Sequence, residues 1–208
     1  MTPIALIDYR AGNLTSVKKA LAAVGAEVFV PDSPAAIGRA HGVVVPGVGH
    51  FGATTAIDDQ WTEAILALIG AGRPLLGICL GMQWLYEGSD EAPDCPGLGV
   101  LSGRCFRLSG SSATDGERLK VPHVGWNVLE RRRDDAIADG VPDRTQVYFT
   151  HSYVAPVTPD TVAKTSHGEV FASIVQRGQI AGVQFHPEKS GDVGLRILRN
   201  FVQSATHE

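Results

Sequence analysis

Short apolar segments alternate with amphipathic stretches through the first half of the chain. The segments that suit strands buried in a sheet are residues 4–7, 27–30, 42–45 and 74–78. The stretches with apolar residues at helical spacing are residues 14–24, 61–69 and 80–87. Asn13 and Gly25 bracket the first of these stretches as an N-terminal cap and a stop. Strands that alternate with helices predict an α/β fold with a central, mostly parallel sheet flanked by helices.

The pattern changes after residue 98 to short segments rich in β-forming residues. They are residues 104–107, 124–130, 146–149, 162–165, 170–176 and 180–184. We expect them to add an antiparallel or mixed β region in the C-terminal half. Residues 191–203 then close the chain as a helix. Its apolar side carries Val193, Ile197, Leu198, Phe201 and Val202.

Two polar segments are expected at the surface. The loop at residues 109–116 is rich in serine and glycine and is the best candidate for disorder. Residues 131–135 read Arg-Arg-Arg-Asp-Asp, which is typical of a solvated turn between strands. No repeat or linker divides the chain, so we expect a single domain over residues 1–208.

Composition and charge narrow the class of protein. The chain has 208 residues, of which 44% are hydrophobic and 19% charged, as in a globular protein with a sizeable core. Its formal net charge of −4 argues against a cationic surface for nucleic acid or an anionic membrane, so small molecules or proteins are the expected partners. The chain has no apolar run of about 18 residues and no targeting segment at its start. We therefore expect no membrane span and a cytoplasmic location.

The chain has three cysteines, Cys79, Cys95 and Cys105. Their odd number, without a Cys-x-x-Cys or His-x-x-x-His pairing, argues against a disulfide framework and against a zinc site. A cysteine with a special role is therefore expected to be a nucleophile.

A glycine motif follows the third expected strand. Residues 47–52 read Gly-Val-Gly-His-Phe-Gly and match the dinucleotide-binding pattern G-x-G-x-x-G. That pattern belongs after the first strand, with an acidic residue about 20 positions later, where this chain has Gly-Ala-Gly-Arg at 70–73. We interpret residues 46–49 instead as a tight turn, either a plain one or one whose uncovered N–H groups approach a ligand.

Cys79 lies between Gly77 and Gly81, where an expected strand meets an expected helix. This arrangement is typical of a nucleophile elbow, in which the glycines leave room for a strained turn that presents the side chain at the carboxyl end of the sheet. The Leu80 N–H would face a developing oxyanion there, and the start of the helix would favour the thiolate. The alternative is an inert cysteine packed in the core.

An imidazole and a carboxylate follow the last expected strand. His186 and Glu188 are two residues apart, and Pro187 between them stiffens the backbone so that both side chains can turn to one side. Cysteine, histidine and carboxylate make a complete set for acyl transfer: the thiolate attacks, the imidazole moves the proton, and the carboxylate orients the imidazole. A capped core histidine and a surface acid are the separate alternatives.

These residues carry a resemblance to a known family. Residues 77–83, Gly-Ile-Cys-Leu-Gly-Met-Gln, and residues 184–188, Gln-Phe-His-Pro-Glu, resemble the signature of class I, triad-type glutamine amidotransferases, which release ammonia from glutamine through a thioester. Four further segments resemble, within that family, the glutaminase subunits of imidazole glycerol phosphate synthase, an enzyme of histidine biosynthesis. They are Asp-Tyr-Arg-Ala-Gly-Asn-Leu at 8–14, Pro-Gly-Val-Gly at 46–49, Val-Pro-His-Val-Gly-Trp-Asn at 121–127 and His-Ser-Tyr at 151–153. Val124 departs from the resemblance, because methionine is the usual residue there.

The resemblance implies a reaction and a partner. The fold would be that of a class I glutamine amidotransferase, and glutamine would be hydrolysed to glutamate and ammonia. The ammonia would pass to a cyclase subunit, a TIM barrel that forms a heterodimer with the chain and makes imidazole glycerol phosphate and an aminoimidazole carboxamide ribotide. No cofactor and no metal are implied.

The resemblance and the chemistry also assign residues around the catalytic set. An oxyanion needs two donors, and the loop with Val48 and Gly49 is the candidate for the second beside Leu80. The residues implied to hold glutamine are Gly49, Gln83, Glu91, Ser152 and Tyr153. The residues expected at the cyclase interface are Asn13, Trp126, Tyr148 and Lys189, with His151 near its mouth. A solvated loop acid is the alternative for Glu91, and core packing is the alternative for the aromatic residues.

Three other functions remain open. A glutaminase for another synthase, such as the anthranilate or aminodeoxychorismate type, would share the catalytic set but is expected to have histidine at Met82 and to lack the sequence at 122–126. A cysteine peptidase on a related fold is disfavoured by Gln83 and Glu188. An inactive binding subunit is disfavoured by the intact Cys79, His186 and Glu188.

Overall fold

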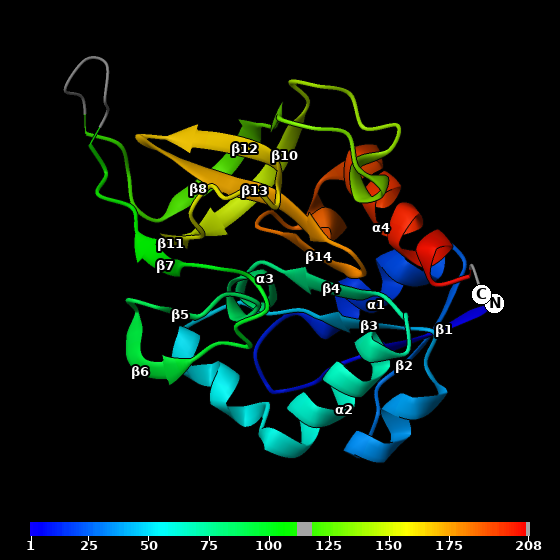
Figure 1. Ribbon diagram of the computed structural model, residues 1–208. Helices are drawn as coiled ribbons and strands as arrows, with labels where there is room; N and C mark the ends of the chain where they lie inside the picture. The colour runs from blue at the N-terminus through cyan, green and yellow to red at the C-terminus, as the bar shows by residue number, and fades with distance from the viewer. Residues whose placement is uncertain (112–117, 207–208) are drawn as a thin grey trace.

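The computed structural model describes residues 1–111 and 118–206, and its centre is an eight-stranded sheet (Figure 1). In spatial order its strands are β2 (Ala26–Phe29), β1 (Thr2–Leu6), β3 (Gly42–Val45), β4 (Leu75–Ile78), β14 (Ile180–Val183), β13 (Glu169–Arg177), β12 (Thr161–His167) and β9 (Glu130–Arg131). The first five strands pair in parallel, and β14, β13, β12 and β9 pair antiparallel. This confirms the mostly parallel sheet with an antiparallel β addition, although the added strands continue the same sheet.

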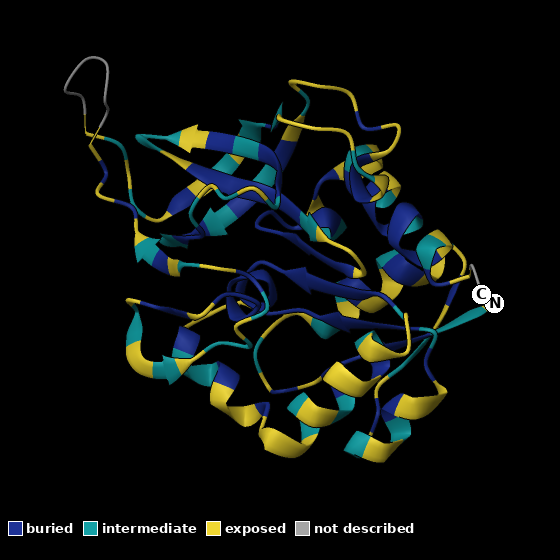
Figure 2. Ribbon diagram, viewed as in Figure 1, coloured by how far each residue is buried: buried dark blue, intermediate teal, exposed yellow. Residues whose placement is uncertain are grey.

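Helices cover both faces of the parallel part, as predicted. On one face lie α1 (Leu14–Ala23) and α4 (Gly191–Ser204), and on the other lie α2 (Asp59–Gly70) and the 3-10 helix η1 (Pro34–Arg39). Successive side chains of β1 point to opposite faces, so Leu6 packs in the cluster with Leu21 and Phe201, whereas Ala5 packs in the cluster with Ile65. Figure 2 shows the buried strands between helices whose outer sides are exposed.

The helix boundaries follow from local capping and, for α3, from hydrogen bonds to a later loop segment. The Asn13 side chain accepts from Ser16 N–H at 3.3 Å, and Gly25 after the helix has φ +95°, so α1 lies within a residue of its predicted bounds. The short α3 (Leu80–Trp84) stops before the predicted residue 87. The reason is that the Trp84 carbonyl accepts from Leu98 N–H at 2.6 Å, so the later segment takes over the carbonyl groups that a longer helix would use.

Two smaller sheets complete the C-terminal half. β8 (His123–Val128) and β10 (Gln146–His151) form an antiparallel pair with His123 opposite His151 and Trp126 opposite Tyr148. A four-stranded sheet has the order β11 (Tyr153–Val154), β7 (Arg104–Arg107), β5 (Gly88–Ser89) and β6 (Ala92–Pro96). The remaining 3-10 helices are η2 (Phe51–Ala56), η3 (Ala136–Ala138) and η4 (Pro187–Lys189).

Two polar segments, residues 109–116 and 131–135, were expected at the surface, and the second of them is more than a solvated turn. Of the loop predicted to be disordered, residues 112–116 lie outside the described residues. Within residues 131–135, Arg131 bonds to Asp134 at 3.0 Å and donates to the carbonyl oxygens of Ala138 and Val141, so it holds the following turn as well as meeting solvent. In the part of the chain that the structure describes, no helix combines the length and hydropathy that a membrane span needs.

Candidate active site

Cys79 occupies a strained turn between β4 and α3. Its backbone has φ +53°, an unfavourable value for a residue with a side chain. The turn is compact because a Cβ added to Gly77 would lie 2.6 Å from the Gly81 carbonyl oxygen, and one added to Gly81 would overlap the Val45 carbonyl oxygen. The flanking glycines are therefore required by backbone packing, as the elbow interpretation supposes. Since α3 has only five residues, its dipole gives less support to a thiolate than a longer helix would.

His186 and Glu188 form a buried pair beyond the end of β14. His186 Nδ1 lies 2.8 Å from Glu188 Oε1, and the two side chains are 4% and 2% exposed. His186 Nε2 has no hydrogen-bond partner among the described residues, so this nitrogen is the one available for proton transfer. Burial opposes the charged imidazole, but the nearby Cys79 and Glu188 outweigh it and raise the pKa of His186 to about 9.

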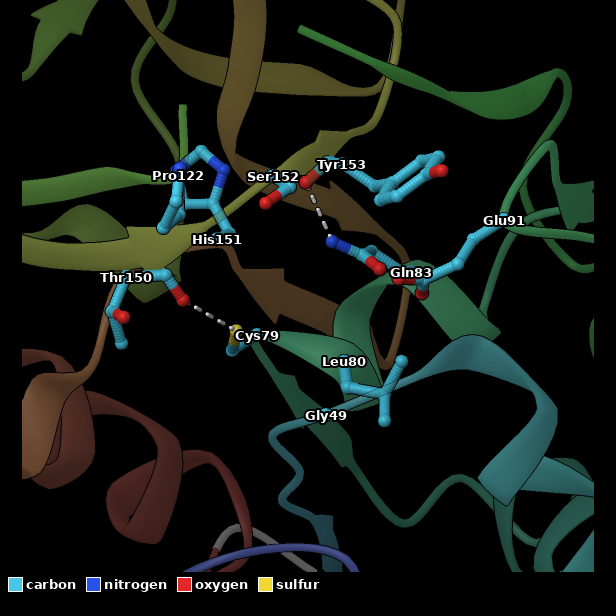
Figure 3. Close-up of a pocket in the computed structure, with 10 residues that line it drawn as sticks. All are labelled: Gly49, Cys79, Leu80, Gln83, Glu91, Pro122, Thr150, His151, Ser152 and Tyr153. Carbon is cyan, nitrogen blue, oxygen red and sulfur yellow. Dashed lines mark hydrogen bonds between the residues drawn. The ribbon is translucent and has the colours of Figure 1, made fainter. Parts of the chain in front are cut away.

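The Cys79 sulfur is held by two groups that the sequence did not single out. Its thiol lies 3.9 Å from the Thr150 carbonyl oxygen, to which it donates (Figure 3). The side-chain amide of Gln184 donates to Cys79 Sγ at 3.7 Å. The thiol is therefore hydrogen-bonded to the Thr150 backbone in this state.

The Leu80 N–H is hydrogen-bonded to the loop that was expected to supply the second oxyanion donor. It donates to the Gly47 carbonyl oxygen at 3.3 Å. The peptide unit between Gly47 and Val48 thus presents its oxygen, and not its N–H, to the place where an oxyanion would form. Gly49 follows with φ +109°, and Val48 is 38% exposed. The Leu80 N–H, the first of the expected oxyanion donors, is therefore not free toward Cys79 in this arrangement.

A pocket of about 200 Å³ opens beside Cys79 (Figure 3). Its lining residues are Gly49, Cys79, Leu80, Gln83, Glu91, Pro122, Thr150, His151, Ser152 and Tyr153. All five residues expected to hold glutamine are among them. Gln83 Nε2 donates to the Tyr153 carbonyl oxygen at 2.8 Å, and Glu91 Oε2 accepts from Phe51 N–H at 2.7 Å. Glu91 is therefore fixed at the pocket wall and is not a freely solvated loop acid.

The residues expected at a partner interface lie outside this pocket. Trp126 is 54% exposed and packs edge-on against Tyr148, with 6.0 Å between the ring centroids. Lys189 Nζ lies 5.7 Å from the Tyr148 ring centroid. Asn13 caps α1, so its side chain already has a structural role. Core packing is thus ruled out for Trp126, which is an exposed apolar group beside Tyr148.

A buried histidine pair, one member of which is the pocket-lining His151, was not foreseen. His123 Nδ1 lies 3.2 Å from His151 Nε2, and the His123 ring stacks on His167 at 4.1 Å between centroids. Burial lowers the pKa of His123 to about 4 and that of His151 to about 3, because a charged imidazole would lose its hydration. The pairing depends on the register of β8 with β10, which no local sequence signal predicts.

Comparison with known proteins identifies similar chains. The family described as "Glutamine amidotransferase class-I" matches residues 5–205. The imidazole glycerol phosphate synthase subunit HisH of Symbiobacterium thermophilum is 44% identical and covers 97% of this chain and 93% of its own length. The protein with the same description from Thermococcus kodakarensis is 43% identical, with 95% and 98% covered.

Solved structures show the same fold at lower identity. One described as glutamine amidotransferase has a TM-score of 0.74 at 20% identity and covers 98% of this chain and 99% of its own. The structure of PurLQS from Thermotoga maritima has a TM-score of 0.70 at 17% identity, with 98% and 97% covered. At these identities the likeness concerns the fold alone.

Proposed function

Since the chain belongs to the class I glutamine amidotransferases, and within them to the family of the imidazole glycerol phosphate synthase subunits HisH, we propose that its pocket hydrolyses glutamine with Cys79, His186 and Glu188 as the catalytic set. The observation that carries this proposal is the elbow cysteine beside a buried histidine–carboxylate pair and a pocket. The anthranilate-type alternative fits less well, because Met82 and the sequence at 122–126 follow the pattern expected of the histidine pathway.

The reaction proceeds in two acyl-transfer steps. The Cys79 thiolate attacks the side-chain amide carbon of glutamine, and the carbonyl oxygen becomes an oxyanion. His186 Nε2–H then protonates the leaving nitrogen, so that ammonia departs and a thioester remains. Water attacks the thioester while His186 takes its proton, and glutamate leaves as the thiolate is restored. Glu188 accepts a hydrogen bond from His186 Nδ1–H throughout and stabilises the positive charge on the ring.

The pocket walls suit the two charged ends of glutamine. The Glu91 carboxylate is the proposed partner of the substrate ammonium, because it is the acidic side chain that lines the pocket. Ser152, Tyr153 and the backbone of Gly49 are proposed to meet the substrate carboxylate, and Gln83 to contact the side-chain amide. A desolvated ammonium or carboxylate without such partners would cost several kcal/mol, on the order of a lost charged hydrogen bond or more.

The proposed partner is a cyclase subunit, a TIM barrel that receives the ammonia and makes imidazole glycerol phosphate and an aminoimidazole carboxamide ribotide. The printed names of the relatives support a partner, since they describe subunits of a synthase. The exposed Trp126, with Tyr148 and Lys189 beside it, is the proposed docking surface, and Asn13 is a further proposed contact. Direct transfer makes physical sense because free ammonia in neutral water is mostly protonated and then cannot act as a nucleophile. Residues 1–208 are proposed to act as one domain, and the cytoplasm is the proposed location.

Ammonia release from glutamine, measured with and without the cognate cyclase, tests this function. We expect release that increases when the liganded cyclase is present. Cys79→Ser should abolish glutamine-dependent synthesis, because a hydroxyl is a far weaker nucleophile at neutral pH. The same variant should still bind the cyclase and support synthesis from added ammonium salt. Glutaminase activity within about tenfold of the wild type in this variant would exclude Cys79 as the nucleophile.

A further inference from the structure

Gln184 is a buried residue that touches the reacting sulfur. It follows β14 directly, and its side chain is 0% exposed. The backbone brings it there, because β14 pairs in parallel with β4, with Val183 opposite Ile78. Cys79 N–H also donates to the Val183 carbonyl oxygen at 2.7 Å. Gln184 and Cys79 therefore leave neighbouring strands side by side, which explains how Gln184 Nε2 reaches Cys79 Sγ at 3.7 Å.

The two contacts of the sulfur respond differently to loss of its proton. The Thr150 carbonyl oxygen can only accept, so its contact with the sulfur at 3.9 Å needs the thiol proton. The Gln184 N–H can donate to the sulfur in either state. A charged acceptor strengthens a hydrogen bond, so the Gln184 contact gains when the thiolate forms, whereas the Thr150 contact becomes repulsive.

Gln83 holds the Gln184 amide in the orientation that this role requires. Gln83 Nε2 donates to Gln184 Oε1 at 3.2 Å and to the Tyr153 carbonyl oxygen at 2.8 Å. Because the amide oxygen of Gln184 is occupied by Gln83, its NH₂ group faces the sulfur. Gln83 lines the pocket, so a chain of hydrogen bonds runs from the pocket wall to the nucleophile.

We propose that Gln184 is a further catalytic residue, whose side-chain amide stabilises the Cys79 thiolate and holds the sulfur in place for attack, and that Gln83 is the positioning residue that orients it. The thiol proton passes to His186 Nε2, which leaves a thiolate and an imidazolium, and Gln184 itself neither gains nor loses a proton. This inference rests on the nucleophilic role of Cys79 in the proposed function.

Alkylation of Cys79 by iodoacetamide tests the contact directly. The full-length chain is treated without glutamine between about pH 5 and pH 10, and the peptide that carries Cys79 is followed by mass spectrometry. Gln184→Met removes the donor and keeps a similar volume. We expect the midpoint of its pH profile to rise by about one unit, the size of one hydrogen bond to a charged group, and the rate at pH values well below the wild-type midpoint to fall about tenfold.

Two further variants separate this role from packing. Gln184→Asn keeps a buried amide but is too short to reach the sulfur, so it should shift the midpoint in the same direction. This variant provides the test if Gln184→Met does not fold. Ser173→Ala on the neighbouring β13 removes a buried hydrogen bond to Thr165, 2.8 Å long, with no contact to Cys79, and should leave the midpoint unchanged. Folding of each variant is checked by circular dichroism.

The outcomes are distinct. A folded Gln184→Met or Gln184→Asn chain with the wild-type midpoint would overturn the proposal, and so would an equal shift in Ser173→Ala. Alkylation needs no turnover of glutamine, so the role of Gln184 can fail while glutaminase activity stands. The proposed function fails separately, if the wild-type chain with its cyclase releases no ammonia from glutamine.

Discussion

His186 shows how one residue is prepared for its chemistry by its surroundings. Its ring is buried, which alone would favour the neutral form, yet Cys79 and Glu188 raise its pKa to about 9. In the proposed mechanism the proton that His186 takes from Cys79 is therefore held next to the sulfur, from where it is given to the leaving nitrogen of glutamine. The proposed role of Glu188 is indirect, because it would act by its charge and by fixing Nδ1 as the protonated nitrogen of the ring.

Substitutions at these two residues should lower turnover unequally. His186→Ala removes the proton carrier and should reduce kcat for glutamine hydrolysis by at least about 10³-fold. Glu188→Gln keeps the bulk and loses only the charge and control of the ring tautomer, so its loss should be smaller. Steady-state glutaminase assays of the complex give both values, and synthesis from ammonium salt serves as the control. If Glu188→Gln proved the worse of the two, the carboxylate would be acting as a base itself and the triad assignment would be wrong.

At the scale of elements, the elbow depends on close contact between β3, β4 and α3. Gly81 lies against the Val45 backbone so tightly that a methyl group has no room. We expect Gly81→Ala to lower the free energy of unfolding by more than about 2 kcal/mol, because backbone rather than a flexible side chain would have to move. Gly70 at the end of α2 is a matched control with no atom within 4 Å of an added Cβ. Gly70→Ala should be neutral or slightly stabilising, since alanine is the better helix former. Urea denaturation measures both, and equal effects would contradict this account of the elbow.

The two buried histidines on the paired strands β8 and β10 should lower the stability of the fold at acid pH. The pKa values of His123 and His151 are lowered to about 4 and about 3, so below the usual value of 6.5 the unfolded chain binds protons that the folded chain does not. Stability from these groups is present above pH 6.5 and is lost as the pH falls toward 4. For His123 alone the loss by pH 4 is about 3 kcal/mol. His186 does not add to this fall, because its ring is protonated in both states over that range.

Calorimetry between pH 4 and pH 7 checks this expectation. The double substitution His123→Gln and His151→Gln should lower stability at pH 7 and flatten its dependence on pH. Substitution of the exposed His50 by Asn is the control and should leave the wild-type slope. An unchanged slope in the double variant would show that other groups, such as carboxylates, account for the acid sensitivity.

The extent to which sequence predicts structure here depends on how local each signal is. β1, β3 and β4 were predicted because their apolar runs are contiguous, and α1 because its caps are adjacent to it. β5, β6 and β11 were missed because they have two to five residues, and β6 contains proline and aspartate.

The same distinction applies to the site. Cys79, with its flanking glycines, and the pair His186 and Glu188 are local patterns, so the sequence alone singles them out. The contacts of Gln184 and Thr150 with the sulfur depend on which strands pair and in which register. The bond from Leu80 N–H to the Gly47 carbonyl oxygen depends on the orientation of one peptide unit, which glycine leaves free to vary.

At the scale of the whole molecule, one loop extends from the pocket beside Cys79 to the protein surface. The loop of Val48 and Gly49 follows β3, lines the pocket through Gly49 and reaches solvent through Val48, which is 38% exposed. A partner that covers this side of the protein can therefore touch the peptide unit that blocks Leu80. Glutamine hydrolysis can in this way be linked to occupancy of the cyclase, which would prevent waste of ammonia.

We expect the partner to gate hydrolysis by turning the peptide unit between Gly47 and Val48. In the isolated chain the Gly47 carbonyl oxygen accepts from Leu80 N–H at 3.3 Å, so a developing oxyanion would meet an oxygen instead of two donors. Rotation of that unit would free Leu80 N–H and bring Val48 N–H toward the oxyanion, at modest cost because Gly47 precedes it and Gly49 follows Val48. One such donor is typically worth about 10² to 10³ in rate, so the liganded complex should form the thioester faster than the isolated chain by at least that factor. Single-turnover measurement of thioester formation in both, with the unliganded complex as an intermediate case, tests this directly. Equal rates would mean that the oxyanion hole works without the partner, and gating would have to be abandoned even if Cys79, His186 and Glu188 kept their roles.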